Sequence, residues 1–181
     1  VAAAVGFGLT GILNATVFPL IEQGLQAGPE ALGPAQAIQG VAALAGGLLS
    51  ALVLRRLGER RLFAWGMTLV AVGSFAAYAL VQWPLPEEWM RWAGMALVQW
   101  PIGFGVPWVV VGLSTLRMRR VPRRLQGRTS AAMNVAINVP QMLMFALGTA
   151  AMAVVDFRWL LLAAAIGVAG AAIAVWLGRA G

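Results

Sequence analysis

The chain has 181 residues, of which 61% are hydrophobic and 10% are charged. Soluble domains are about 45–50% apolar and about 25% charged, so this composition excludes an ordinary water-soluble protein. The net charge of +7 comes from arginines between apolar runs, which indicates membrane topology signals rather than nucleic-acid binding. Cys and His are absent, which excludes disulfides, thiol or imidazole catalysis and the usual zinc ligands. The six acids lie in or beside predicted loops, so we expect no metal site, no cofactor and no enzyme.

Six apolar runs are long enough to cross a bilayer, which takes about 20 residues. They cover roughly 1–21, 35–54, 62–82, 89–116, 127–155 and 159–177. These runs predict an all-α membrane protein with one six-helix transmembrane domain over 1–181. The chain begins at Val1, inside an apolar run and without the basic region of a signal peptide. We therefore expect it to begin inside a longer chain.

The connections between these runs are alternately poor and rich in arginine. Eleven of the thirteen arginines lie in 55–61, in 117–128 or at the C-terminus, whereas the first and third connections carry mainly glutamates. The positive-inside rule makes the arginine-rich connections cytoplasmic, and both ends of the chain with them. Trp83, Trp89, Trp92 and Trp159 gather on the opposite side, as interfacial anchors do.

The polar side chains within the spans are mostly amides, and they lie on the first, second, fourth and fifth helices. They are Asn14, Gln36, Gln39, Gln99, Asn134, Asn138 and Gln141. Polar groups inside a bilayer normally face the bundle interior or a wet cavity. We therefore expect these four helices to line something, and the third and sixth to lie outside. On the first helix, Phe7, Thr10, Asn14 and Phe18 share one face.

The fifth helix carries the sharpest pattern. Asn134, Asn138 and Gln141 are spaced i, i+4, i+7, which places them within an arc of about 60°, and Phe145 continues the row. Interhelical hydrogen bonds in membranes average about 0.6 kcal/mol, so packing explains three amides poorly and a substrate cavity is favoured. For Asn14 a bond to a neighbouring helix remains an equal alternative.

The fourth helix contains Pro101 and Pro107 between Gln99 and Trp108, so we expect it to bend or break there. Such a helix is typical of a transporter gate, although packing alone also produces kinks. Trp100, Phe104 and Trp108 share a face, and a packing stripe is favoured over ligand contact. The candidate substrate contacts are Asn14, Gln39, Gln99, Trp100, Asn134, Asn138, Gln141 and Phe145.

Two basic connections resemble motifs of a known family. Arg55-Arg56-Leu57-Gly58-Glu59-Arg60-Arg61 resembles the G-x-x-x-D-R-x-G-R-R loop of the major facilitator superfamily. Arg56, Gly58, Arg60 and Arg61 match, whereas Ala51 replaces the glycine and Arg55 the acid. The segment 121–128 resembles the V-P-x-E-L-Q/R-G-R segment of bacterial efflux-type members. Pro122, Gly127 and Arg128 match it, and Arg124 replaces the acid.

The resemblance implies the C-terminal six-helix half of a drug or macrolide exporter. It implies a 3+3 inverted repeat, with the first, second, fourth and fifth helices at a central cavity and the other half in the same chain. The expected protein is a multidrug antiporter of a bacterial plasma (inner) membrane, exporting amphipathic small molecules by alternating access. Protons are a candidate coupling ion, although no acid lies within the spans and Glu22 is the nearest.

Two other classes stay open. Asn138-Val139-Pro140 resembles the Asn-Pro-Ala box of water channels, but only once, whereas channel selectivity needs paired elements. The second is a membrane scaffold or regulatory protein without transport of its own. The sequence alone does not separate these classes from a transporter.

Overall fold

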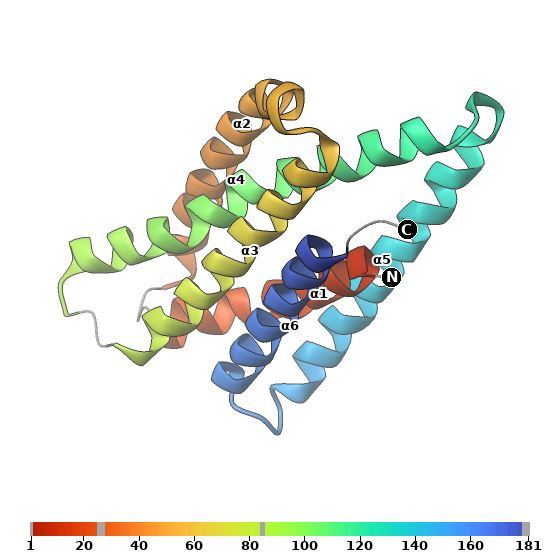
Figure 1. The fold of residues 1–181 in the computed structure, drawn as a ribbon. Coiled ribbons are helices and arrows are strands. Elements are labelled where there is room, and N and C mark those ends of the chain that lie inside the picture. The colour runs from red at the N-terminus through yellow and green to blue at the C-terminus, as the bar shows by residue number, and fades with distance from the viewer. Residues whose placement is uncertain (1, 25–27, 84–85, 179–181) are drawn as a thin grey trace.

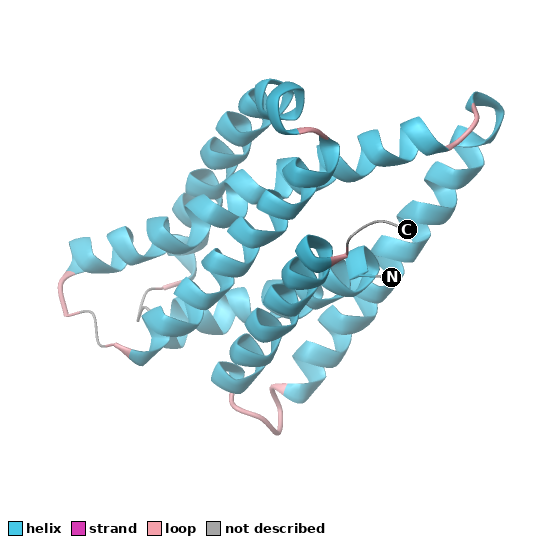
Figure 2. Ribbon diagram, in the orientation of Figure 1, coloured by secondary structure: helices cyan, strands magenta, loops and turns pink. Residues whose placement is uncertain are grey.

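The computed structural model describes residues 2–24, 28–83 and 86–178, and the prediction of an all-α fold is confirmed over them. Figure 1 shows the α-helices in chain order, and Figure 2 shows short connections between them. The helices are α1 (Ala2–Pro19), α2 (Leu32–Leu57), α3 (Glu59–Gln82), α4 (Glu88–Arg120), α5 (Gln126–Ala151) and α6 (Phe157–Leu177). A π-helical turn, Leu20–Gly24, continues α1, and short 3₁₀ turns, Pro29–Ala31 and Arg123–Leu125, precede α2 and α5.

Five of the described helices, α2 to α6, are long and apolar enough to cross a membrane. The first predicted span corresponds to α1 and its π-helical turn, and its crossing of the membrane stays a prediction. Helices α2, α3 and α4 extend beyond their apolar runs into arginines and glutamates, because backbone hydrogen bonding continues where a helix leaves an apolar layer. α5 ends at Ala151, earlier than its apolar run. Asp156 begins the next helix by accepting a hydrogen bond from the Arg158 amide at 2.9 Å.

The helices form two groups of three. One group contains α2, α3 and α4, and the other contains α1, α5 and α6. The groups meet where α3 packs against α6, and these two helices lie side by side near the centre of Figure 1. At the arginine-rich end, α4 and α5 leave their short connection as the two arms of a V (Figure 1).

The packing core lies along α3 and α6. Leu62 and Ser74 of α3 and Leu161 and Val168 of α6 are fully buried. The opposite faces of both helices are exposed, as at Val72 and Ile166, and can face lipid. The sequence predicts that these two helices lie outside the group that lines the interior. The prediction applies to the exposed face of each helix, whereas the opposite face forms the centre of the packing core.

The contact between α3 and α4 depends on small residues. A Cβ added at Gly105 would lie 2.7 Å from the Gly66 carbonyl oxygen, and one added at Gly66 would lie 2.7 Å from the Val109 nitrogen. Real side chains do not approach backbone atoms so closely, so the two glycines allow the backbones to meet, as small residues commonly do between membrane helices. This contact fixes α4, which forms one wall of the cavity described below.

Candidate functional site

A cavity of about 520 Å³ lies between the two groups of helices and is lined by residues of all six. Cavities of about 300–1,000 Å³ are typical of small-molecule sites. All the amides singled out in the sequence line this one cavity: Asn14, Gln36, Gln39, Gln99, Asn134, Asn138 and Gln141. The geometry thus brings together side chains from α1, α2, α4 and α5 that are distant in sequence.

The amide row of α5 faces the cavity at the spacing that the sequence predicts. Asn134, Asn138 and Gln141 all line it, and α5 passes Pro140 without interruption. The Asn138 side-chain amide donates to the Asn134 carbonyl on its own helix at 2.8 Å. The Gln141 side chain donates to the Thr10 hydroxyl of α1 at 3.4 Å. Gln141 therefore combines both roles considered for the row, since it contacts a neighbouring helix and lines the cavity.

The opposite wall has a similar arrangement. The Gln99 side chain on α4 donates to the Ala35 carbonyl of α2 at 3.5 Å. Both interhelical bonds are long for N–H···O bonds, whose usual length is about 2.9–3.0 Å, so each amide keeps most of its capacity for another partner. Within the described part of the chain, Asn14, Gln36, Gln39 and Asn134 make no side-chain hydrogen bond. Their amide groups can both donate to and accept from a ligand or water.

Aliphatic side chains complete the cavity. Val70 and Ala77 of α3 and Leu161 of α6 line it beside Ser74, whose hydroxyl donates to the Val70 carbonyl at 2.8 Å. A surface of amides and aliphatic groups suits a ligand that is partly polar and partly apolar.

Two candidate substrate contacts lie outside this lining. The Trp100 side chain is 46% exposed and the Phe145 side chain 47% exposed, and neither lines the cavity. The row on α5 leaves the cavity after Gln141 because α1 packs closely against α5 there: a Cβ added at Gly11 would lie 3.0 Å from the Phe145 nitrogen. Among the other residues expected on the α1 face, Phe18 is exposed outside the cavity. The side chain of Phe7 lies outside the described residues.

Two aromatic residues of α4, Phe104 and Trp108, lie where α4 packs against α2. The rings of Phe104 and Trp108 meet edge to face with centroids 5.5 Å apart, and the Trp108 indole donates to the Gly46 carbonyl at 2.9 Å. Of the two alternatives expected for α4, a bend or a break, the break is excluded, because a single helix runs through Pro101 and Pro107. The bend itself stays a prediction.

Arg117 is a lining residue that the sequence interpretation assigned only to topology. It is the one charged residue among those that line the cavity over the described chain. A signal was present, since Val106, Val110, Ser114 and Arg117 recur at helical spacing and all line the cavity. Met133 also lines the cavity, whereas none of the aromatic residues of the described chain does, so the candidate contacts Trp100 and Phe145 are replaced there by a charged and aliphatic surface.

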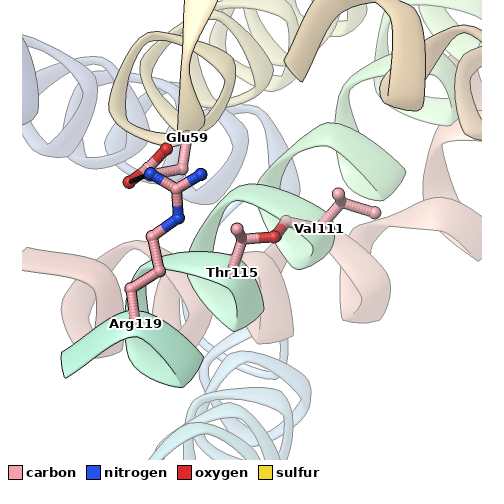
Figure 3. Close-up of polar contacts among 4 residues, drawn as sticks. All are labelled: Glu59, Val111, Thr115 and Arg119. Atoms are coloured by element: carbon pink, nitrogen blue, oxygen red, sulfur yellow. Dashed lines mark hydrogen bonds and ion pairs between the residues drawn. The ribbon is translucent and has the colours of Figure 1, made fainter. Parts of the chain in front are cut away.

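Apart from Arg117, the described residues of the two basic connections lie outside the cavity lining. Figure 3 shows the Arg119 guanidinium facing the Glu59 carboxylate, with an Nη1–Oε1 distance of 3.1 Å that links α4 to α3. On the preceding turn of α4, Thr115 donates to the Val111 carbonyl at 2.8 Å. Gly58 joins α2 to α3 with a φ of +79°, a conformation that favours glycine. The remaining motif residues outside the cavity are largely exposed: Arg56, Arg60, Arg61, Pro122, Gly127 and Arg128.

These features define an integral membrane protein whose helices surround a cavity lined by amide and aliphatic side chains. A family model described as Major Facilitator Superfamily matches residues 1–180, and the chain belongs to this family. Its members are transporters rather than enzymes. The search of curated proteins and the search of solved structures each return no match.

Proposed function

We propose that this chain is the C-terminal half of a secondary active transporter, and that the cavity between its helix groups binds amphipathic small molecules. The observation that carries the proposal is the convergence of all seven amides on one cavity of about 520 Å³. In a bilayer, polar side chains usually mark the path of a substrate or ion. Four of these amides have no hydrogen bond within the described chain, so they are available to a ligand.

The pattern of helix contacts supports a 3+3 inverted repeat. When the first three helices are exchanged with the last three, the contact of α1 with α5 corresponds to that of α4 with α2. The contact of α1 with α6 corresponds to that of α4 with α3, and the contact of α3 with α6 corresponds to itself. The shorter contact of α2 with α3 has no equally extensive counterpart. Transporters of this kind move by rocking such units around a central site, which makes alternating access the mechanism we propose.

The arginine asymmetry supports the proposed orientation. We place the connections 55–61 and 117–128, and both chain ends, in the cytoplasm. The location in a bacterial inner membrane, the exporter direction and the multidrug character rest on the likeness of 121–128 to efflux-type proteins. Proton-driven transporters usually need a membrane-embedded acid, and the predicted spans contain none, so the other half would supply it.

Transport by the full-length protein in proteoliposomes tests the function. A panel of fluorescent amphipathic cations, neutral compounds and anions would be followed with and without a proton gradient. Saturable flux is expected for at least one compound. Flux that never saturates would favour a channel, and no flux under any gradient would favour a scaffold or regulatory protein.

Alanine at Asn138 or Gln141 tests the site. We expect either change to raise KM or alter the preference among transported compounds, while the melting temperature stays near that of the parent. Val139→Ala is the matched control, because Val139 lies on α5 outside the cavity lining and its side chain is 47% exposed. If Asn138→Ala and Gln141→Ala transport every compound as the parent does, the cavity is not the substrate site.

Cysteine labelling tests the orientation, and the chain has no native cysteine. Gly58 is a poor labelling site because its φ of +79° strains any other residue. Arg56, near the C-terminal end of α2, and Glu87, directly before α4, are both exposed and lie at opposite ends of this group of helices. A cysteine at either position is therefore a better probe than one at Gly58. Arg56→Cys should resist an impermeant thiol reagent in intact cells, whereas Glu87→Cys should react. The reverse result would invert the topology.

A further inference from the structure

Arg117 differs from the other arginines of the basic connections in where its side chain lies. It is half-buried and lines the cavity, and it forms no hydrogen bond or ion pair with its side chain within the described chain. Arg119, two residues later, points to the opposite side and pairs with Glu59 at 3.1 Å. An unpaired guanidinium in a cavity between helices needs an anionic partner more than an exposed one does.

We infer that Arg117 forms an anion-binding subsite at the arginine-rich end of the cavity, and that the substrate carries a carboxylate or a similar small anionic group. The guanidinium is a cation that presents two parallel N–H donors, and these match the two oxygens of a carboxylate. The described lining contains no acid that could compete for it.

Two neutral polar side chains can complete the subsite. Ser114 precedes Arg117 by about one turn of α4, and Asn134 lines the same cavity from α5. Neither side chain makes a hydrogen bond within the described residues. A hydroxyl and an amide can each donate to an anionic oxygen that the arginine leaves free.

The position of Arg117 also orients the ligand. Along α4, Arg117 lies 18 residues after Gln99 (117 − 99), and both line the cavity; at about 1.5 Å per residue this separation is about 27 Å. The stretch between them is lined by Val106, Val110 and Leu113. An amphipathic ligand would therefore place its anionic group at Arg117 and its apolar part along this stretch. The ligand's status as a transported substrate rests on the proposed function, whereas the anion subsite does not.

The local electric potential provides a test that needs no knowledge of the substrate. Asn134→Cys introduces the only cysteine of this chain, and its reaction rates with a sulfonate-bearing and an ammonium-bearing methanethiosulfonate are compared in the full-length protein. With Arg117 facing the cavity, the anionic reagent should be favoured, and adding Arg117→Gln should lower the anion-to-cation rate ratio by about tenfold. Arg124→Gln is the matched control, because Arg124 is exposed in the same connection and lies outside the lining, and it should leave the ratio nearly unchanged.

A pair of ligands tests the recognition itself. 1-Naphthaleneacetate and its neutral amide have the same shape, and their binding to the purified full-length protein is measured by equilibrium dialysis near neutral pH. The parent should prefer the carboxylate, and Arg117→Gln should weaken carboxylate binding by about 10- to 100-fold without affecting the amide. Arg117→Lys keeps the positive charge but loses the two parallel N–H donors of the guanidinium. This variant should therefore retain part of the preference for the carboxylate over the amide.

The outcomes separate this inference from the proposed function. An unchanged rate ratio in Arg117→Gln, no carboxylate binding by the parent, or a preference that survives the substitution would each overturn the anion subsite, even if the protein transports neutral compounds. If the ratio and the carboxylate preference both depend on Arg117 but no compound is transported, the subsite stands and the transport function fails.

Discussion

Gly11 sets the distance between α1 and α5, and Gly11→Ala should push α5 away from its position. A Cβ built at Gly11 would overlap the Gln141 carbonyl oxygen and would lie 3.0 Å from the Gln141 carbonyl carbon and 3.0 Å from the Phe145 nitrogen. These are backbone atoms of a helix, so no side chain can rotate aside to make room. The helices must separate, and the amide row on α5 must move with them.

The magnitude follows from two opposing terms. Overpacking a close contact costs about 1–3 kcal/mol, whereas replacing glycine by alanine in a helix gains up to about 1 kcal/mol. Because the collision is with helix backbone atoms, the cost lies near the upper end of its range, about 2–3 kcal/mol. After the gain of about 1 kcal/mol, the net loss is about 1–2 kcal/mol, which lowers the melting temperature of a domain of this size by about 2–8 °C. Thermal unfolding of purified Gly11→Ala in detergent measures this shift.

Gly8→Ala is the control for this prediction. Gly8 precedes Gly11 by about one turn and also faces α5, but a Cβ there would lie 3.4 Å from the Pro140 Cβ, which is an ordinary contact. This variant should match the parent or melt slightly higher, because it gains helix propensity without a collision. If Gly11→Ala and Gly8→Ala have the same melting temperature, α1 and α5 do not approach each other at Gly11 as closely as the structure indicates.

Two further predictions concern contacts of α4. Trp108→Phe removes the indole hydrogen bond to the Gly46 carbonyl and should lower the free energy of unfolding by about 0.5–1.5 kcal/mol. Trp100→Phe, at a side chain that is 46% exposed, should lower it less. Equal melting temperatures of the two variants would contradict a stabilising role of this hydrogen bond. A double-mutant cycle on Glu59 and Arg119, whose side chains are 20% and 70% exposed, should give a coupling of less than about 1 kcal/mol that decreases with salt; a larger, salt-independent coupling would show that the pair is shielded from solvent.

The helical character could be predicted from composition, because a segment that crosses a bilayer satisfies its backbone hydrogen bonds by forming a helix, and the apolar runs of this chain are long enough for that. The helix ends could not be predicted from hydropathy. α4 is 33 residues long, which corresponds to about 50 Å, whereas the apolar layer is about 30 Å thick. A helix that leaves the membrane continues for as long as its hydrogen bonds and packing allow, and hydropathy does not report this.

The amides of the cavity could be predicted because their positions follow from helical arithmetic on single helices. Asn134, Asn138 and Gln141 lie on one face by their spacing alone, and the cost of unpaired polar groups directs that face inward. Trp100 and Phe145 show where this reasoning stops. Each lies near a cavity residue along its helix, but whether a face still borders the cavity one turn later depends on where two helices cross. That crossing is set by contacts such as Gly11 with Gln141, which couple residues far apart in sequence.

Arg117 shows that one residue type can satisfy two explanations at once. An arginine at the end of a membrane helix contributes to topology whichever way its side chain points. The positive-inside rule therefore counts Arg117 and Arg119 equally and does not distinguish their side-chain positions. The direction of the side chain is decided by helical phase: Arg117 continues the cavity face of Val106, Val110 and Ser114, whereas Arg119, rotated by about 200°, reaches Glu59. Helices α4 and α5 diverge from their connection (Figure 1), and the cavity that both helices line includes Arg117. A residue assigned to the aqueous side by its charge can therefore line the same cavity as the amides deeper in the membrane.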